Sequence, residues 1–300
     1  MKKVLVYCAT GSQQRPVIGI LKSMYFEVFA ATRSDKNFDR LNELGAIPVT
    51  VDLASFSSLV KASEGMDYVS FIIPASLPNP FDGLIYSMKL IDAAKTANVK
   101  HIVWNTSGYF TSGKTGNPMS DVKLDVRRHL ENSGVPYTII ESNIYLENLL
   151  APYTNEYVKK EAKLAYPLPA DMPVGWIATK DVAAFSALAL GKPEMHGKIF
   201  RVSGTENLTG KELADRISKG LGLNLDYYAL PPEEFGKIMS GLMDETSAKA
   251  IELHYQSIAD SAPDYPDMFN NDIINLSKQF GVSMTPVEDW AREYRSIFIA

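Results

Sequence analysis

A glycine-containing turn near the N-terminus is the stretch of this chain whose residue types best suit binding of a phosphate. Residues 3–17 predict a buried strand, a tight turn and the first turn of a helix. The start of a helix offers unpaired backbone N–H groups and a partial positive charge, and both favour an anion. Pro16 suits the first helical turn, where no backbone donor is required. The turn around Gly11 is therefore the first candidate for a nucleotide site.

The turn departs from the usual dinucleotide-binding pattern of three closely spaced glycines. Where glycines are sought three residues apart, Cys8 and Gln14 occupy the outer positions and only Gly11 is present. A side chain at Gln14 is expected to crowd the phosphates and the approach of the helix to the strand, which would weaken or abolish binding. We interpret Cys8 as a small buried hydrophobe rather than a reactive thiol.

Positive charge at the end of the second predicted strand indicates which dinucleotide would fit. A free ribose 2′-hydroxyl usually meets an Asp or Glu about 20 residues beyond the glycine turn. Here Thr32, Arg33 and Ser34 end the strand, and the first carboxylate is Asp35. The planar donors of Arg33 suit a phosphate, so NADP is favoured over NAD if a dinucleotide binds. Arg15 is a candidate to reinforce the anion site, and a solvated surface arginine is the alternative for both.

A lysine in the fifth predicted helix is the candidate for acid–base chemistry. In common short-chain dehydrogenases, a tyrosine stands four residues before a lysine on the same helix face, and the ammonium lowers the pKa of the phenol. Lys123 is present here, but Met119 occupies the position four residues before it, so a conventional alcohol dehydrogenase is not expected. Lys123 could still hydrogen-bond a nicotinamide ribose or polarise a substrate carbonyl. An ion pair with Asp121 or Asp125 is the alternative.

Polar and aromatic side chains follow the fifth and sixth predicted strands, where a substrate pocket is expected to open. We predict that Ser107 and Tyr109 are catalytic together with Lys123, and that Asn143 contacts the cofactor. Aromatic walls with a few amides and hydroxyls suit a flat, conjugated substrate. The alternative is that the aromatic side chains pack the seam between two domains.

The elements that would position these residues alternate regularly through the first half of the chain. Strands are predicted at Lys3–Tyr7, Glu27–Ala31, Ile47–Val51, Tyr68–Ile73, His101–Asn105 and Tyr137–Glu141, and helices at Pro16–Met24, Asn37–Leu44, Phe56–Ser63, Gly83–Ala97 and Ser120–Ser133. The strands are nearly continuous in apolar residues, which is typical of a parallel sheet covered on both faces. The series predicts an α/β fold of the doubly wound Rossmann type, with its ligand crevice at the carboxyl ends of the strands.

The second half is less regular and predicts a smaller, mostly helical domain. Residues 1–150 are expected to form the dinucleotide-binding domain, to which the chain returns around 174–204. Residues 151–300 are then a discontinuous domain for a substrate or a partner, with a proline-rich break near 262–266. Thr209 and Glu212 have the spacing of a capping box at the start of a helix.

Composition excludes several classes of function. The 300 residues are 46% hydrophobic and 22% charged with a net charge of -5, which suits a globular protein without a basic field for nucleic acid. No apolar run approaches the ~20 residues that cross a bilayer, so we expect a cytoplasmic protein that does not bind membranes. The single cysteine forms no internal disulfide, and the four scattered histidines predict no metal site.

The order of these motifs resembles the NmrA-like group of atypical short-chain dehydrogenases/reductases. The matching segments are Ala9 to Gln13, Thr32 with Arg33, Val51 to Leu53, Ser133 to Thr138, Glu147 with Asn148, Trp176 to Ala178, Asp181 with Val182, and Leu208 to Leu213. The resemblance implies a Rossmann-type domain, a small C-terminal domain and, in several members, NADP(H). Some members reduce quinones or other conjugated substrates, whereas others are redox-sensing regulators.

The resemblance also implies roles for single residues in binding the dinucleotide. Gly11, Ser12 and Gln13 would contact the pyrophosphate with Thr10 beside them, Asp52 and Leu53 would flank the adenine, and Pro74, Ala75 and Ser76 would run beside the nicotinamide-side ribose. Glu141 departs from the family, whose members often carry arginine there.

Two classes of function follow from these observations. Lys123 and the aromatic residues favour an NADPH-dependent oxidoreductase acting on a quinone, an enone or a similar small electrophile. Met119 and the altered turn favour a non-catalytic regulator, in which NADP(H) occupancy changes binding to a protein partner. A fold that has lost its cofactor and binds another small ligand is a third interpretation.

Overall fold

The computed structural model describes residues 1–74, 77, 80–110, 113–114, 116, 118–261 and 268–299. The chain forms two compact units, and each is built from two separate segments of the sequence. The first unit comprises Met1–Ser142 and Thr179–Arg201, and the second comprises Asn143–Ala178 and Val202–Ala300. The domain bounds predicted at residue 150 and around 174–204 stay a prediction.

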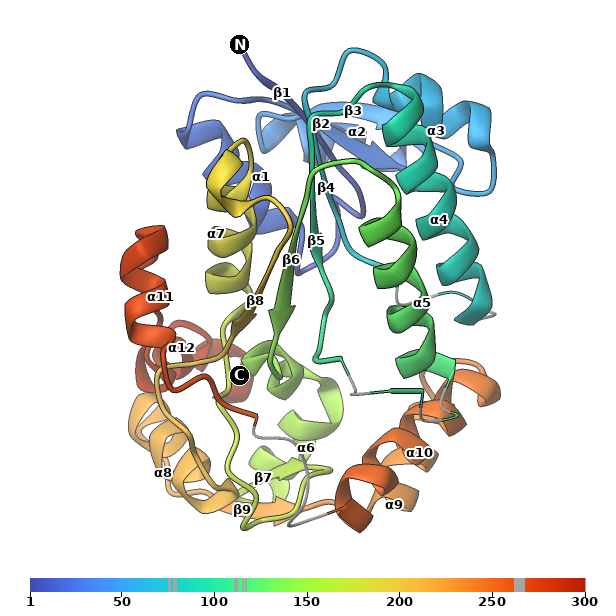
Figure 1. The fold of residues 1–300 in the computed structure, drawn as a ribbon. Coiled ribbons are helices and arrows are strands. Elements are labelled where there is room, and N and C mark those ends of the chain that lie inside the picture. The colour runs from blue at the N-terminus through green and yellow to red at the C-terminus, as the bar shows by residue number, and fades with distance from the viewer. Residues whose placement is uncertain are drawn as a thin grey trace. The chain divides into compact units, whose positions relative to one another are not determined.

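A seven-stranded parallel sheet forms the centre of the first unit, in the order β3-β2-β1-β4-β5-β6-β8 (Figure 1). Its strands are β1 (Lys3–Val6), β2 (Glu27–Thr32), β3 (Ile47–Thr50), β4 (Tyr68–Phe71), β5 (His101–Asn105), β6 (Tyr137–Ser142) and β8 (Lys198–Val202). β1 lies between β2 and β4, with Leu5 in register with Phe29 and Val69. Because the strand order reverses beside β1, the carboxyl end of β1 is the expected place for a ligand. The predicted doubly wound α/β fold is confirmed.

Helices cover both faces of this sheet. They are α1 (Arg15–Ser23), α2 (Phe38–Glu43), α3 (Phe56–Ser63), α4 (Pro80–Thr96), α5 (Pro118–Asn132) and α7 (Thr179–Ala189). Figure 1 shows α1 and α7 on one side of the sheet and α3, α4 and α5 on the other. The first five of these helices begin and end within three residues of the predicted positions, and the largest shift is that of α4, which begins at Pro80 rather than at Gly83.

An aromatic stack in the core supports the segment that follows β5. The rings of Phe71 and Trp104 stack with their centroids 5.7 Å apart. Phe110 packs edge-on against Trp104 at 5.5 Å. Burying large aromatic rings removes much apolar surface from water, so this stack fixes the backbone on which Ser107 and Tyr109 are carried.

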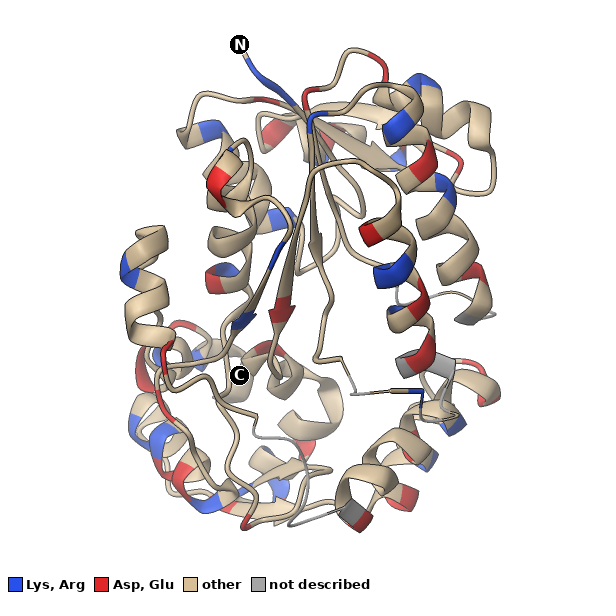
Figure 2. Cartoon of the chain, in the orientation of Figure 1, with Lys and Arg blue, Asp and Glu red and all other residues tan. Residues whose placement is uncertain are grey.

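The second unit is mostly helical in its described residues. It contains α6 (Pro152–Glu161), β7 (Lys163–Tyr166), α8 (Gly210–Leu221), β9 (Asp226–Ala229), α9 (Pro232–Ser240), α10 (Glu245–Ser261), α11 (Ile273–Phe280), α12 (Val287–Glu293) and α13 (Arg295–Ile299). The two short strands β7 and β9 pair in parallel, and the sequence did not predict this pairing. The predicted break near 262–266 lies outside the described residues. Among the helices that the structure describes, none has the length and apolar character needed to span a bilayer, and Figure 2 shows charged residues along most of them.

The capping box predicted at the start of α8 is confirmed. Thr209 Oγ1 accepts a hydrogen bond from the backbone N–H of Glu212, and Glu212 Oε2 accepts one from the backbone N–H of Thr209 at 2.9 Å. We expect Thr209→Ala to lower the free energy of unfolding by about 1 kcal/mol, because the backbone N–H of Glu212 loses the side-chain oxygen that accepts its hydrogen bond. Urea denaturation followed by circular dichroism measures the change. Thr246→Ala, at an exposed position within α10, is the matched control, and equal losses in both variants would contradict the capping role.

Candidate functional site

The turn between β1 and α1 is built around a left-handed residue that is not glycine. Cys8 has a φ of 54°, and the backbone N–H of Gly11 donates to the carbonyl oxygen of Cys8 at 2.9 Å. A Cβ at Gly11 would lie 3.2 Å from that same oxygen, so a side chain there would force the turn to shift. The first turn of α1 carries no acidic side chain, which leaves its partial positive charge available to an anion.

The Gln14 side chain lies between α1 and the sheet, as its position predicts, and its predicted effect on the phosphates stays a prediction. Its side chain is buried, with 1% of the residue's surface exposed. Gln14 Oε1 accepts a hydrogen bond from Ser70 Oγ on β4 at 3.2 Å. The side chain therefore fills the space between the helix and the sheet, where a glycine would otherwise allow close packing, and the hydrogen bond offsets part of the cost of burying its amide.

Cys8 is half-buried rather than fully buried as the sequence predicts. Its Sγ lies 3.9 Å from the carbonyl oxygen of Ile72. Burial raises the pKa of the Cys8 thiol to about 11, while the positive charge of Arg33 acts in the opposite direction. The thiol is thus protonated near neutral pH and is a poor nucleophile.

β1 and β2 pair in parallel with Val6 beside Ala30, which brings Arg33 to the same end of the sheet as the turn. Arg33 itself is exposed, directly after β2. Hydrogen bonds from Thr32 Oγ1 to the Ser34 carbonyl oxygen at 3.2 Å and from Asn37 Nδ2 to Thr32 Oγ1 at 3.3 Å fix the segment on either side of Arg33. An exposed cation on a fixed backbone beside a helix start suits a terminal phosphate group.

The remaining residues predicted to bind a dinucleotide follow the carboxyl ends of β1, β3 and β4. Ser12 and Arg15 are exposed, and Thr10, Leu53 and Pro74 are half-buried. Asp52 is exposed after β3, and its Oδ1 accepts a hydrogen bond from the backbone N–H of Ala54 at 2.9 Å. Ala75 and Ser76 lie outside the described residues. The roles of all these residues stay predictions.

Side-chain hydrogen bonds connect the turn after β1 with the end of β5. Gln13 Nε2 donates to Ser107 Oγ at 2.7 Å, and Asn105 Nδ2 donates to Gln13 Oε1 at 3.5 Å. The backbone N–H of Ser107 donates to Asn105 Oδ1 at 2.9 Å, and Ser107 has a φ of 53°. A non-glycine residue held at positive φ is strained, and such strain often accompanies a functional site. The structure therefore brings together Gln13 and Ser107, which the sequence placed in separate roles.

Lys123 extends from α5 to this segment. Its Nζ donates to the carbonyl oxygen of Ser107 at 3.2 Å. Burial lowers the pKa of Lys123 to about 8, and the negative charge of Glu141 opposes that shift. Gly108 has a φ of 139°, and a Cβ there would come within 2.8 Å of Lys123 Nζ, so only glycine allows the ammonium this approach.

Lys123 does not form the alternative contact, an ion pair with Asp121 or Asp125. Asp125 pairs instead with Lys114 at 2.9 Å and with Arg128 at 3.5 Å. Asp121 Oδ2 accepts a hydrogen bond from the backbone N–H of Gly116 at 3.0 Å. Lys123 is therefore held by the segment after β5 rather than by the surface of its own helix.

An ion pair between the buried Glu141 and the partly exposed Arg201 shapes the wall on which Tyr109 lies. Glu141 is 5% exposed, its Oε1 accepts from the backbone N–H of Phe110 at 2.5 Å, and its Oε2 lies 3.3 Å from Arg201 Nε. The guanidinium carbon of Arg201 lies 4.3 Å from the centre of the Tyr109 ring. Arg201 thus compensates the charge that the unusual Glu141 brings and also holds Tyr109 by a cation–π contact. The sequence did not single out Arg201, because it lies about 60 positions from Glu141 and in no motif.

The side-chain amide of Asn143 is engaged within the second unit, and the predicted contact of Asn143 with the cofactor stays a prediction. Its side chain is 1% exposed. Asn143 Nδ2 donates to the carbonyl oxygens of Gly175 and Met268, and its Oδ1 accepts from the backbone N–H of Ile144 at 2.8 Å. Both amide hydrogens and the amide oxygen are used to join backbone segments of the second unit.

In the described part of the chain, no three His, Cys, Asp or Glu side chains lie together as candidate metal ligands.

A family model, described as the NmrA-like family, matches residues 1–297. The chain belongs to the NmrA-like family. A related protein in Xenophilus azovorans, an NAD(P)H azoreductase, is 29% identical over 268 residues, which are 87% of this chain and 88% of that protein.

Solved structures of similar fold include two complexes with nicotinamide coenzymes. The triphenylmethane reductase of Citrobacter sp., complexed with NADP(H), has a TM-score of 0.79 and 20% identity over 97% of this chain and 99% of its own. The NADPH-dependent quinone oxidoreductase of Escherichia coli, complexed with NADPH, has a TM-score of 0.76 and 21% identity over 97% of this chain and 99% of its own. At this level of identity the likeness establishes the shared fold.

Proposed function

We propose that this NmrA-like protein is an NADPH-dependent oxidoreductase of a quinone, an enone or a similar small electrophile. The observation that carries the proposal is the placement of Lys123. Its desolvated ammonium is held at the Ser107 carbonyl oxygen, and Ser107 is in turn hydrogen-bonded to Gln13 of the candidate phosphate turn. A potential proton donor therefore lies beside the expected coenzyme site.

The residues of the first turn fit the proposed coenzyme. The backbone around Gly11 and the start of α1 would hold the pyrophosphate, because the Gln14 side chain is packed inside and no acidic group lies in the first helical turn. Arg33 would bind the extra phosphate of NADPH, by which it differs from NADH. The names of the azoreductase and of the two coenzyme complexes agree with this choice. When bound, NADPH supplies a hydride.

The residues of this chain would supply the proton and the binding surface. A lysine with a pKa of about 8 is mostly protonated at neutral pH but gives up its proton more readily than an ordinary lysine, which suits a general acid. Lys123 would donate to the substrate oxygen or nitrogen on which negative charge develops. Tyr109, held by Arg201, would offer a flat apolar face to a conjugated substrate.

The test is a nicotinamide absorbance assay with a panel of small quinones and enones. We expect consumption of NADPH with at least one substrate and much slower consumption of NADH. The regulator alternative, which Met119 favours, predicts tight binding of NADPH without consumption across the panel. Failure to bind NADPH would contradict both functions.

A further inference from the structure

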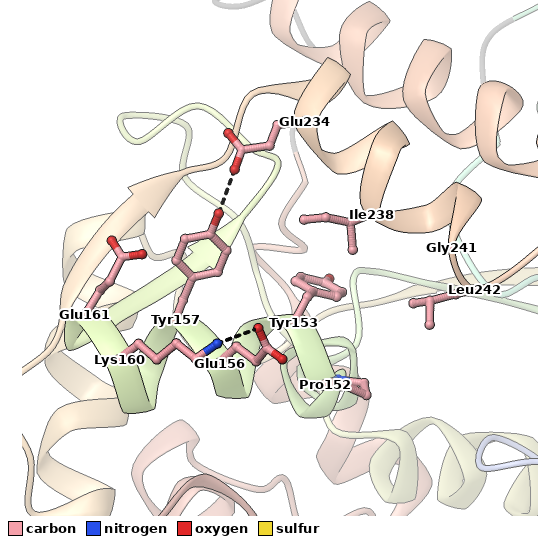
Figure 3. Close-up of a pocket in the computed structure, with 10 residues that line it drawn as sticks. All are labelled: Pro152, Tyr153, Glu156, Tyr157, Lys160, Glu161, Glu234, Ile238, Gly241 and Leu242. Carbon is pink, nitrogen blue, oxygen red and sulfur yellow. Dashed lines mark hydrogen bonds and ion pairs between the residues drawn. The ribbon is translucent and has the colours of Figure 1, made fainter.

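A separate cavity lies wholly within the second unit, between α6 and α9 (Figure 3). Its volume of about 490 Å³ falls in the range of ~300–1,000 Å³ that is usual for small-molecule sites. It is lined by Pro152, Tyr153, Glu156, Tyr157, Lys160, Glu161, Glu234, Ile238, Gly241 and Leu242. A buried cluster that includes Phe235 and Met239 supports Tyr153, Tyr157 and Ile238 from behind. The walls are thus fixed by the core of the unit.

One end of the cavity is apolar. Figure 3 shows Ile238, Leu242 and Pro152 around the Tyr153 ring at this end. Tyr153 is held in place by an edge-on contact with Phe235, with ring centroids 5.3 Å apart. Leu242 is 60% exposed, so a large apolar side chain remains available to a ligand. Such a surface favours a ligand with a hydrocarbon or aromatic body.

The other end carries a preorganised carboxylate. Glu234 Oε1 accepts a hydrogen bond from the Tyr157 hydroxyl at 2.6 Å, and Glu234 Oε2 accepts one from the Tyr228 hydroxyl at 3.3 Å. Both donors are neutral, so they fix the orientation of the carboxylate without neutralising it. The hydrogen bond to Glu234, followed by burial, raises the pKa of Tyr157, which keeps this phenol a donor at neutral pH.

The charges around the cavity favour a cation over an anion. Three glutamates and one lysine line it, and that lysine, Lys160, is already paired with Glu156 at 3.2 Å. Glu161 is likewise paired with Lys163 at 2.8 Å, so among the lining glutamates only Glu234 has no ion pair within the described part of the chain. The rings of Tyr153 and Tyr157, which line the cavity, can also attract a cation. Glu234 therefore combines an un-neutralised carboxylate with electron-rich rings.

We propose that this cavity binds a small organic cation, an ammonium group on an aromatic or branched apolar body. The ammonium would pair with Glu234 and the tyrosine faces, and the apolar body would occupy the end formed by Tyr153, Ile238 and Leu242. The described residues provide no cluster of metal ligands here, so an inorganic divalent ion is not the ligand that the site suits. The site is independent of the proposed redox function.

Calorimetric titration of the full chain with phenethylammonium chloride tests the proposal. The matched probes are 2-phenylethanol, which has the same body without the charge, and phenylacetate, which has the opposite charge. We expect saturable binding of phenethylammonium that is about tenfold tighter than that of 2-phenylethanol, and no binding of phenylacetate. Equal binding of the three probes, or none of phenethylammonium, would overturn the proposal.

Matched variants locate the binding to this cavity. Glu234→Gln should weaken phenethylammonium binding about tenfold, because the amide keeps an acceptor oxygen but loses the charge. Glu233→Gln removes a neighbouring carboxylate that pairs with Lys237 at the surface, and it should leave binding unchanged. Ile238→Trp should block the apolar end, whereas Ile274→Trp at an exposed position of α11 should not. Equal losses in either pair would contradict the site, and NADPH affinity measured on the same samples reports separately on the coenzyme site.

Discussion

Lys123→Ala is expected to lower kcat for the best quinone or enone substrate by about 10²–10³, the usual contribution of a positioned general acid. The substitution removes the only described lysine ammonium hydrogen-bonded to the Ser107 carbonyl oxygen. NADPH affinity should fall much less, because the phosphate contacts assigned to the turn after β1 and to Arg33 remain. Stopped-flow absorbance under saturating NADPH measures the chemical step, and Lys95→Ala, in the last turn of α4, is the control. Unchanged kcat in Lys123→Ala would remove Lys123 from the mechanism.

The pH dependence of kcat/KM gives an independent readout of the same residue. Burial lowers the pKa of Lys123 to about 8, so the ammonium is present below this pH and is lost as the pH rises through it. Activity that needs the proton should therefore be full at neutral pH and decline above about 8. Glu141→Gln removes the negative charge that opposes the shift, and the decline should move to lower pH. A profile that is flat through this range in the unaltered protein would contradict the assignment.

Arg33→Ala is expected to raise the Kd of NADPH by about 30-fold, which corresponds to about 2 kcal/mol for loss of a charge-assisted phosphate contact. The Kd of NADH should stay within about twofold, because NADH lacks the phosphate that Arg33 would bind. Fluorescence titration with each coenzyme measures both values. Arg40→Ala, at an exposed arginine of α2, is the matched control. Equal losses for NADPH and NADH in Arg33→Ala would show that Arg33 acts only through general charge.

The fold of the first unit could be predicted because its signals are local and repeated. The buried strands are continuous apolar runs, and Gly45, Gly65 and Gly134 all adopt the positive φ expected after a helix. The pair β7 and β9 was missed although each strand is as long as β1, β3 and β4, because the two strands lie outside the regular alternation of strands and helices in the first unit. Their pairing also joins segments about 60 residues apart, which no local signal reports.

The candidate site could be predicted in its residue types but not in its contacts. The position of Gln14 indicated a conflict with the turn. Only the structure shows that the Gln14 side chain is buried and accepts a hydrogen bond from Ser70 on another strand. Asn143 has the residue type of a ligand contact, but its amide joins Gly175 and Met268 in the fold. Both outcomes depend on partners distant in sequence, which residue type and spacing do not reveal.

We infer that the turn after β1 and the start of α1 hold the pyrophosphate of NADPH although Cys8 and Gln14 replace glycines. A crystal structure of the full chain grown with saturating NADPH tests this inference. We expect diphosphate density against the backbone of residues 11–15, the 2′-phosphate beside Arg33, and the Gln14 side chain still hydrogen-bonded to Ser70. Density for the coenzyme elsewhere, or none at this turn, would show that the turn does not hold the coenzyme.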